Sequence, residues 1–500
     1  MDDLLSVQLP AHQVYALSLC GILIALFIAR QVLPLIYIWC RALFLLGLRL
    51  FSYTFIINRH RWAGPWTISL ILGRGIYVVS NAVCLLLPQP SRTELASRAG
   101  YLAATNITPL FLSFHLDFLA NSLGLSRKTT QEVHKAAGVM TFALLLLHVS
   151  LSLDLEEVLD LYRIMASASV GLMAVLSIVP LRKRVYELAD KTHRALAVII
   201  AFSTWQHIST AAYVQQWLLF TLIGLIGLVH AVQFLLFLYR NTRWGKPFPK
   251  AYIINDGVIV RIVLQLPRPI KIDAGQYISL SIMSSTLGFW SWAQSHPFTI
   301  TSWSPLKQDK LELYVQCRGG LTLRLLHMGE RNCLAFFSGP YGKSHSLKEA
   351  KCVLMLTTDF GIIAVLPYLK KITATHKCRA HIIWHVKRLS EFAPLVALLN
   401  DYLQDPTLRR ILQISIYNEG ATHNEALGDH GRVNTFPHAP NIAEILQSEV
   451  DGDSIPEFSV IDLFVLSVSG SHELRDTTRK VAGRYLSRGL ILEELDYQQE

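Results

Sequence analysis

Apolar runs of about 20 residues in the first half constrain this chain more than any other feature, because a bilayer core about 30 Å thick needs that length per helix. After about Arg243, short β-branched runs alternate with Gly, Pro and charged residues, which is typical of soluble structure. The whole chain is 52% hydrophobic and 16% charged, too apolar for a wholly soluble protein. We therefore predict a multidomain protein with a multi-pass, α-helical transmembrane bundle at residues 1–245. The seven predicted helices run from Tyr15 to Trp39, Thr67 to Leu87, Tyr101 to Leu119, His134 to Leu153, Ser167 to Leu181, His193 to Ala212 and Gln216 to Tyr239.

Two features of the N-terminal region bear on this helix count. The stretch from Arg41 to Ile57 is also apolar, but Arg41 and Arg49 within it favour an interfacial helix over an eighth span. The first run does not resemble a cleavable signal peptide, because Asp2 and Asp3 stand where a basic segment is required. We expect this run to remain as an anchor.

Lysine and arginine gather in alternate loops of the predicted bundle, and loops rich in them face the cytoplasm. The basic set comprises Arg41, Arg49, Arg59, Arg61, Arg127, Lys128, Arg182, Lys183, Arg184, Lys191, Arg240, Arg243 and Lys246. The opposite loops hold only Arg92, Arg98 and Arg163. We therefore expect an integral protein of the plasma membrane with its second half in the cytoplasm. The net charge of +10 follows from this topology, and no stripe of basic and aromatic residues indicates a nucleic-acid partner.

Four histidines recur at one spacing within the apolar region. His134 and His148 are fourteen residues apart, and so are His193 and His207 two predicted helices later. Fourteen residues rotate an α-helix by about 1400°, roughly 40° short of four turns, so the two histidines of each helix share a face about 21 Å apart. Both helices run outward from the cytoplasm, which places His134 level with His193 and His148 level with His207.

Two imidazoles on facing helices can be the two axial ligands of one haem iron, which favours electron transfer over ligand binding. We predict two b-type haems, one above the other, held by these four histidines. Packing within the bundle is the alternative, and we favour it for the lone histidines His115 and His230. Ionisable groups inside a membrane are costly and usually functional, which argues against packing for the repeated set. A di-metal site is disfavoured because it needs carboxylates, and Glu132 and Glu187 lie at helix ends.

The residues around these helices are similar to those of a known family. The run RAGYLAATNITPLFLSFHLDFLANSLGLS before the first histidine helix, and LRKRVYELADKTH before the second, resemble the fungal ferric reductase branch of the transmembrane ferric reductase and NADPH oxidase superfamily. Matching residues are Arg98, Asn106, Pro109, Gly124, His134, Gly138, Arg184, Tyr186, Glu187 and His193. His115 stands where the family commonly has an arginine. The extra N-terminal helix and the equal spacing of both pairs favour the metalloreductases over the oxidases of this family.

The first part of the soluble half has motifs of the flavin-binding type. The alternating runs GVIVRIVLQLP, QYISLSI, FTITSW and KLELYVQCR predict an antiparallel β-barrel at residues 248–346. Within it, HPFTI and RGGLT resemble the FAD-binding motifs of ferredoxin-reductase-like domains, and GPYG resembles the segment that closes the barrel. The resemblance implies that an aromatic ring packs on the flavin and that small residues and a hydroxyl contact its pyrophosphate. The implied FAD-binding residues are His296, Pro297, Phe298, Thr299, Arg318, Gly319, Gly320, Thr322 and Gly339.

Residues 350–500 alternate apolar strands with helical stretches, which predicts a doubly wound α/β domain of the nucleotide-binding type. The first turn, TTDFGIIAVLPYL, retains only Gly361 of the glycine-rich phosphate turn that the resemblance implies. Asp359 in that turn would repel a phosphate, unless it caps the helix. Lys387 and Arg388 follow the second strand, where a cation suits the 2′-phosphate of NADPH.

Later motifs of this half depart further from the family. The last strand, VLSVSGSHEL, resembles the family's Cys-Gly-Pro motif only through Gly470, since Ser469 replaces the cysteine that is implied to guide hydride transfer near the nicotinamide. Arg432, in GRVNT, resembles another element that approaches the dinucleotide. The loop from Thr422 to Asp453 is the best candidate for disorder. The seven cysteines include no C-x-x-C pair and indicate neither an iron–sulfur cluster nor a structural disulfide.

Together these features predict an oxidoreductase of the ferric-chelate reductase type. It would transfer electrons from NADPH through FAD and two haems to a ferric or cupric chelate, or a siderophore, outside the cytoplasm. FAD is needed because hydride carries two electrons and a haem accepts one. One alternative keeps the electron path but reduces O₂, which makes a superoxide-generating NADPH oxidase. Another is a haem-binding membrane protein whose nucleotide site has decayed, which the altered glycine turn and missing cysteine favour.

Overall fold

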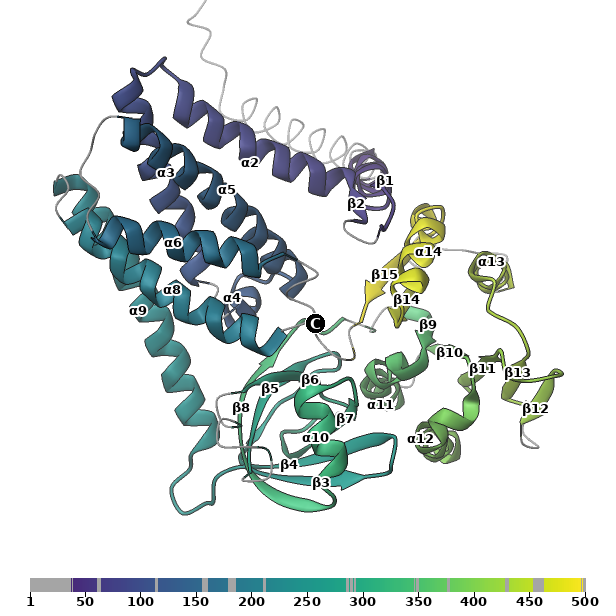
Figure 1. The fold of residues 1–500 in the computed structure, drawn as a ribbon. Helices are drawn as coiled ribbons and strands as arrows, with labels where there is room; N and C mark the ends of the chain where they lie inside the picture. The colour runs from purple at the N-terminus through teal and green to yellow at the C-terminus, as the bar shows by residue number, and fades with distance from the viewer. Residues whose placement is uncertain are drawn as a thin grey trace, which may run out of the picture.

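The computed structural model of the chain describes residues 39–60, 64–112, 116–154, 161–178, 186–209, 213–284, 294–345, 350–375, 378–427, 431–452 and 463–495, with residues 37, 287, 291, 347 and 497. A helical part, an antiparallel sheet and a second sheet flanked by helices follow one another along the chain (Figure 1). The predicted helix from Tyr15 to Trp39 lies outside the described residues except at its end, and His115 and Arg184 lie outside them too.

Six of the seven predicted helices fall on described residues, and a helix is present at each. The helical part comprises a helix over residues 39–52, then α2 (Ile68–Leu86), α3 (Arg92–Leu112), α4 (Leu116–Ser122), α5 (Arg127–Asp154), α6 (Leu161–Leu176), α8 (Tyr186–Ser209) and α9 (Tyr213–Asn241). Among the described helices, three segments are long and apolar enough to cross a membrane: Ile68–Leu86, Arg127–Ser152 and Ile223–Asn241.

The predicted helix from Tyr101 to Leu119 is wrong at its start. α3 begins at Arg92 because Ser91 and Glu94 form a capping box. The Ser91 N–H donates to the Glu94 carboxylate at 2.9 Å, and the Glu94 N–H donates to the Ser91 hydroxyl at 3.4 Å. The described part of α3 runs to Leu112, and residues Leu116–Ser122 form α4. Hydropathy shows where a helix is apolar, whereas capping groups decide where it starts.

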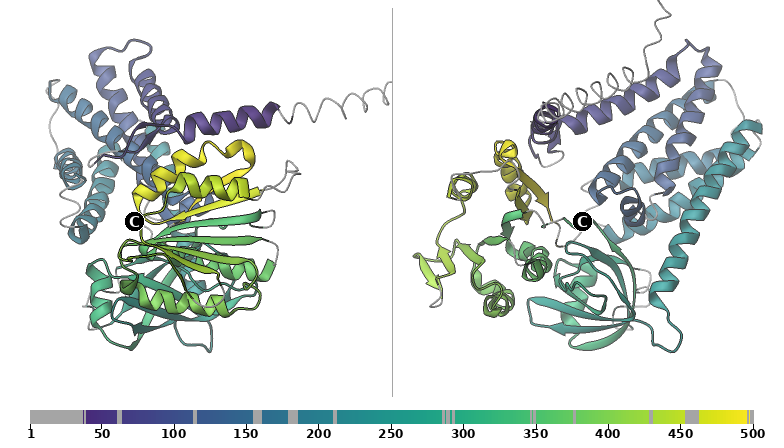
Figure 2. Two further views of the ribbon diagram at one scale, coloured as in Figure 1. Left: turned by 90° about the vertical axis from the view of Figure 1, so that its right-hand side faces the viewer. Right: turned by 180° about the vertical axis from the view of Figure 1, so that it is seen from behind.

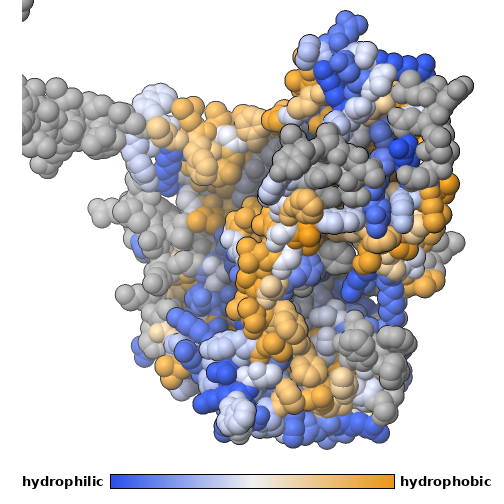
Figure 3. Space-filling model, turned by 90° about the vertical axis from the view of Figure 1, so that its left-hand side faces the viewer, coloured by the Kyte–Doolittle hydropathy of each residue, from blue (hydrophilic) through white to orange (hydrophobic). Residues whose placement is uncertain are grey.

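Small side chains line the closest contact in the bundle, where α3 packs along α5 (Figure 1). Ala99 and Ala103 on α3 and Ala137 on α5 are buried, which lets the two backbones approach closely. On the outside of α9, Trp217 and Phe220 are more than half exposed. Apolar surface is broad over the helical part (Figure 3), as expected of helices that face lipid.

α2 diverges from the other helices (Figure 1 and Figure 2), and polar contacts tie it to α3 and α5. Arg74 Nη2 lies 2.5 Å from Glu132 Oε2, and Asn106 Nδ2 donates to Asn81 Oδ1 at 2.7 Å. The Tyr77 hydroxyl also donates to Asn106. Polar groups inside a membrane pair with one another because hydrocarbon offers them no partner. Glu132 therefore helps to hold α2.

The stretch predicted as an interfacial helix is only partly helical. Its helix ends at residue 52, where the Thr54 hydroxyl donates to the Arg49 carbonyl at 3.0 Å. β1 (Phe55–Ile57) then pairs with β2 (Trp66–Thr67) in an antiparallel hairpin. This β1–β2 hairpin connects the first described helix to α2.

Six strands form the first sheet: β3 (Lys250–Asn255), β4 (Ile259–Ile270), β5 (Tyr277–Met283), β6 (His296–Thr299), β7 (Gln308–Gln316) and β8 (Arg331–Tyr341). They pair antiparallel in the order β6-β5-β8-β3-β4-β7. An isolated bridge between Ile300 and Leu313 links the two outer strands, so the sheet curves until its edges meet. Alternate residues such as Ile262 and Leu280 fill its interior, as the period of two in the sequence predicts. α10 (Gly320–His327) packs against this interior.

The second sheet has seven strands in the order β12-β13-β11-β10-β9-β14-β15, and all neighbours are parallel except β12 and β13. The strands are β9 (Ala350–Thr358), β10 (Arg379–Val386), β11 (Leu412–Asn418), β12 (Glu425–Leu427), β13 (Val433–Phe436), β14 (Leu463–Ser469) and β15 (Leu490–Glu494). From β9 the chain moves to β10 on one side, and β14 lies on the other side. The turns after β9 and β14 therefore meet at the switch point, where such sheets bind ligands.

Helices cover both faces of the second sheet. The helices are η4 (Asp359–Ala364), α11 (Leu366–Thr375), η5 (Leu389–Phe392), α12 (Ala393–Gln404), α13 (Ile442–Gly452), α14 (His472–Ala482) and η6 (Leu486–Arg488). Val353 and Met355 of β9 share a core with α11 and α12, whereas Leu354 and Leu356 share one with α13 and α14. The predicted doubly wound arrangement is therefore present.

The predicted disorder between Thr422 and Asp453 is wrong for most of that segment. It contains β12, β13 and α13. β13 pairs in parallel with β11, and Ile442 and Leu446 of α13 are buried against the sheet. These contacts join residues distant in sequence, and a local excess of polar residues does not reveal them.

Candidate functional site

The four repeated histidines form two ring pairs between α5 and α8. The ring centroids of His134 and His193 lie 6.1 Å apart, and those of His148 and His207 lie 6.3 Å apart. The planes of the two rings are inclined by 54° in the first pair and 56° in the second. The pairing is the one that equal spacing on two helices of the same direction predicts.

The geometry of the pairs fits a metal ion between the rings. Two imidazoles bound to one ion at about 2.0 to 2.1 Å place their centroids roughly 6 Å apart. The His148 Nδ1–H donates to the Ala96 carbonyl at 2.8 Å, so Nε2 is the nitrogen left for a ligand bond. A Cβ at Gly100 would lie 3.0 Å from the His148 ring, so the glycine makes room for that ring. These residues fit the axial ligation of a haem.

Two other candidate ligands of the helical part, His230 and Glu132, have partners elsewhere. His230 Nδ1 donates to the carbonyl of Ile226 on its own helix at 2.8 Å, as the packing interpretation expects. Glu132 pairs with Arg74 and with Lys135, whose Nζ is 2.9 Å from Glu132 Oε1. Over the described part of the chain, no group of three or more His, Cys, Asp or Glu side chains could hold a metal ion. The two imidazole pairs are therefore the candidate metal-binding groups of the described helices.

The HPFTI motif lies on β6 at one edge of the first sheet. Thr299 is opposite Tyr277 of β5 and is buried, and His296 is half-buried. Phe298 is 1% exposed and packs in the interior of the sheet, so its ring is not presented to a flavin in this structure. Pro297 is half-buried beside it. The resemblance implied an aromatic ring that packs on the flavin, and strand alternation turns Phe298 towards the interior of the sheet.

The RGGLT motif forms the turn that starts α10. The Thr322 hydroxyl accepts hydrogen bonds from the N–H groups of Arg318 and Gly319 at 3.0 and 3.2 Å and donates to the Gly319 carbonyl at 2.8 Å. Gly319 and Gly320 have φ values of 145° and 52°, which glycine adopts readily. Thr322 therefore shapes the turn from within, and its hydroxyl is not directed to a ligand as predicted.

Gly339 of the GPYG motif lies within β8 and lets two strands approach. Its φ is 111°, and a Cβ would lie 3.1 Å from the carbonyl oxygen of Tyr277 on β5. Any side chain here would push β8 from β5. Gly339 therefore allows β8 and β5 to lie close together.

A polar cluster that the sequence did not reveal joins the first sheet to the helical part. Asp117 of α4 accepts hydrogen bonds from the hydroxyls of Tyr277 and Ser279 on β5 at 2.9 and 3.3 Å. Arg127, the first residue of α5, places Nε 3.4 Å from the same carboxylate. His134 lies seven residues, about two turns, further along α5. The cluster thus connects the sheet that carries the flavin motifs to the helix that carries the inner histidine pair.

The turns after β9 and β14 touch at the switch point. A Cβ at Gly361 would lie 2.1 Å from the Ser469 carbonyl oxygen, and a Cβ at Gly470 would lie 2.1 Å from Thr358 Oγ1. The Ser471 N–H donates to that Thr358 hydroxyl at 2.7 Å. Both glycines are therefore required by the contact between the two turns. Ser469 is fully buried, so its hydroxyl does not line the crevice where we predicted it near a nicotinamide.

The charged residues predicted near the dinucleotide do not all lie at the turn after β9. Asp359 is the first residue of η4, with a φ of 48°, and Thr358 occupies the N-cap position. Burial raises the pKa of Asp359, although His385 and Lys387 nearby oppose this effect. Arg432 Nη2 donates to the Leu403 carbonyl at the end of α12, 2.9 Å away. Lys387 thus acts electrostatically on Asp359 in the turn after β9, whereas Arg432 is tied to α12.

Known proteins resemble this chain in both halves. Residues 244–361 match the family described as FAD-binding domain. The chain is 25% identical over 300 residues to ferric reductase transmembrane component 3 of Saccharomyces cerevisiae, which covers 56% of this chain and 40% of that protein. It is 28% identical over 311 residues to component 6 of the same yeast, covering 56% and 41%. The chain spans about two fifths of the length of these relatives.

Among solved structures, a flavohemoglobin from Malassezia yamatoensis with bound FAD and heme matches with a TM-score of 0.40 and 14% identity, covering 85% of this chain and 98% of that one. The predicted resemblance to ferric reductase transmembrane components, which are oxidoreductases by name, is confirmed by the sequence matches. With the long apolar helices, they identify a membrane protein in which an FAD-binding domain follows a helical region.

Proposed function

We propose that the protein is a transmembrane metalloreductase that passes electrons from NADPH to a ferric or cupric chelate on the far side of the plasma membrane. The observation that supports this proposal most is the stacking of two imidazole pairs, with ring centroids 6.1 and 6.3 Å apart, between α5 and α8. Residues 1–245 would hold two b-type haems, residues 248–346 FAD and residues 350–500 NADPH. The last two units would lie in the cytoplasm.

Each part of the chain has a distinct task in this proposal. Bound FAD and haem supply the chemistry that converts a two-electron hydride into single electrons. His134 with His193, and His148 with His207, would each hold one haem through both imidazoles, and the bound haem would supply single-electron transfer. The bond from His148 to Ala96 fixes the ring orientation. Asp117 and Arg127 hold the first sheet near the inner pair.

A direct test compares two acceptors in the same membranes. We expect NADPH to drive the reduction of an Fe(III) chelate, and superoxide dismutase to leave the rate unchanged. The paired histidines support outward electron transfer for either acceptor, so the effect of the dismutase decides between a chelate and O₂. Superoxide release that accounts for the chelate reduction would instead support the oxidase alternative.

One observation favours the haem-binding alternative. The hydroxyl of Thr358, in the turn expected to receive phosphates, is used by Ser471, and Ser469 is enclosed. A decayed nucleotide site predicts that the purified protein retains two haems but does not oxidise NADPH. Measurable NADPH oxidation by the purified, FAD-loaded protein would eliminate this alternative.

His296→Ala and Thr322→Ala should each weaken FAD retention about tenfold, the effect of losing one or two hydrogen bonds, while the haem spectrum persists. Thr322 acts through the turn that it shapes, and His296 through a polar group at the sheet edge. The FAD content after gel filtration measures the effect. Thr373→Ala is the control, because the Thr373 hydroxyl donates only within its own helix at 2.6 Å, to Lys370. Full FAD content in both variants would reject the assignment of these motifs.

A further inference from the structure

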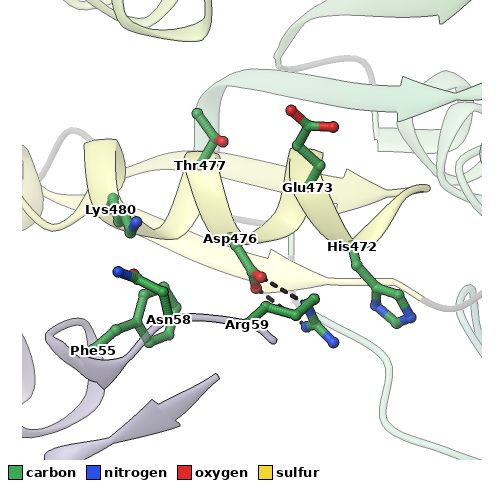
Figure 4. A pocket seen from close by; sticks show the side chains of 8 residues that line it. All are labelled: Phe55, Asn58, Arg59, His472, Glu473, Asp476, Thr477 and Lys480. Atoms are coloured by element: carbon green, nitrogen blue, oxygen red, sulfur yellow. Dashed lines mark hydrogen bonds and ion pairs between the residues drawn. The ribbon is translucent and has the colours of Figure 1, made fainter. Parts of the chain in front are cut away.

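The β1–β2 hairpin of the helical part contacts α14 of the second sheet. Arg59 Nε lies 2.8 Å from Asp476 Oδ2, and Arg59 Nη2 donates to Asp476 Oδ1 at 3.3 Å (Figure 4). The guanidinium thus contacts the carboxylate through two nitrogens, which sets direction as well as distance. The two residues are 417 positions apart in the chain, so the ion pair joins the helical part to the second sheet.

Aromatic side chains extend this contact. Tyr53 packs against the core that α14 shares with β14 and β15. A Cβ at Gly483, just after α14, would lie 3.3 Å from the Tyr53 Cβ, so the glycine leaves space for the tyrosine. Arg479 and Lys480 of α14 lie 5.9 and 5.8 Å from the ring centroid of Phe55, within the range of cation–π attraction. The hairpin therefore contributes to the folded core of the second sheet.

The edge strand β15 makes a second contact with the helical part. Lys128 Nζ, at the start of α5, lies 3.7 Å from Glu494 Oε2. Arg479 of α14 also pairs with Glu494. α14 and β15 are thus bound to the helical part at two places, the β1–β2 hairpin and the start of α5.

α14 is directly joined to the turn at the switch point. The Ser471 hydroxyl accepts the Leu474 N–H at 3.2 Å and so caps α14, while the Ser471 N–H donates to Thr358 of the other turn. A shift of α14 would therefore move the Gly470–Ser471 turn against Thr358. Beside the ion pair lies a cavity of about 410 Å³, lined by Asn58 and Thr477 among others (Figure 4). Arg59 and Asp476 both line this cavity, so on the cavity side the contact between the hairpin and α14 is made by their ion pair.

We infer that the β1–β2 hairpin is a docking surface for α14, with Arg59 and Asp476 as positioning residues that hold the turn after β14 in place for the nicotinamide end of NADPH. The inference rests on the proposed function for its ligand. Neither residue touches the nucleotide. They act on it through α14, and the membrane-embedded helices thereby determine how well the second sheet binds its substrate.

Charge reversal in the full-length protein tests this inference. Arg59→Asp and Asp476→Arg should each raise the KM for NADPH in flavin reduction about threefold to tenfold, with kcat nearly unchanged. Amide hydrogen exchange over residues 472–482 should accelerate in both variants. The double variant restores an opposite-charge pair and should return KM and exchange towards the wild-type values. Glu473→Gln is the matched control, because Glu473 is an exposed acid on the same helix turn that lines the same cavity.

The exchange measurement separates two kinds of failure. If the wild-type protein does not oxidise NADPH, the proposed function fails, and exchange still decides whether the hairpin docks on α14. Unchanged exchange in both single variants would overturn the docking surface. Faster exchange with an unchanged KM would overturn the positioning role. A double variant no better than the single variants would also count against a direct Arg59–Asp476 contact.

Discussion

We expect the replacement of His148 or His207 by alanine to remove the outer of the two proposed haems and to leave the inner one, and the replacement of His134 or His193 to do the reverse. Each pair is a separate set of two rings on α5 and α8, so losing one ring leaves a single axial ligand at that level only. We expect haem content to fall from two to one per chain in each variant. Absorption spectra and haem stoichiometry of the purified protein measure the change.

Two further variants sharpen this test. His230→Ala should retain both proposed haems, because the His230 Nδ1–H donates to the Ile226 carbonyl of its own helix at 2.8 Å. Gly100→Ala should disturb the outer haem alone, because the added methyl group would lie 3.0 Å from the His148 ring. Two bis-imidazole spectra in all four histidine variants would defeat the assignment of the ligands.

Glu449→Gln should destabilise the second sheet by about 2 to 3 kcal/mol, because it leaves a buried network without its charge. The Glu449 carboxylate bonds His381 Nδ1 and lies 2.8 Å from Arg379 Nη2. His381 Nε2 in turn lies 2.9 Å from Ser415 Oγ. His381, Ser415 and Glu449 are all less than 10% exposed, so solvent cannot replace the lost contacts. A lower midpoint of thermal unfolding of the purified protein measures the effect.

The same network predicts a dependence on pH. Burial acts to raise the pKa of Glu449, but the hydrogen bond to His381 and the charge of Arg379 outweigh it, so this pKa lies below its ordinary value of 4.5. The stabilisation is therefore fully present above about pH 4.5 and is lost as the pH falls through the lowered pKa. The difference in the free energy of unfolding between the wild type and Glu449→Gln should become smaller as the pH falls below about 4.5. Glu444 is an exposed acid on the same helix, so Glu444→Gln should change neither the stability nor its dependence on pH. An equal loss of stability in Glu444→Gln would reject the buried network as the cause.

Much of the fold was predictable from periodicity. Six of the predicted helices are present, the alternating runs form the antiparallel sheet, and the β-branched strands form the doubly wound sheet. The errors lie at helix ends and between Thr422 and Asp453, where a capping box and parallel pairing with β11 act against hydropathy. Periodicity reports which face of an element is buried, and it does not report which other segment covers that face.

The sequence by itself determined which histidines meet. A spacing of fourteen on two helices of equal direction leaves one way to pair four rings, because the helical repeat is constant. It also determined that Gly361 and Gly470 lie in turns at the carboxyl ends of strands.

Only the tertiary structure decided where the polar side chains of these motifs point. Thr322 bonds its own turn, Ser469 is enclosed and Arg432 is tied to α12, although each motif had suggested a ligand contact. Two contacts join the helical part to the sheets. Asp117 bonds Tyr277, 160 positions away, and Arg59 bonds Asp476, 417 positions away. A local pattern specifies the backbone of a turn or helix, but the partner of a side chain depends on which distant segments folding brings within about 3 Å of it.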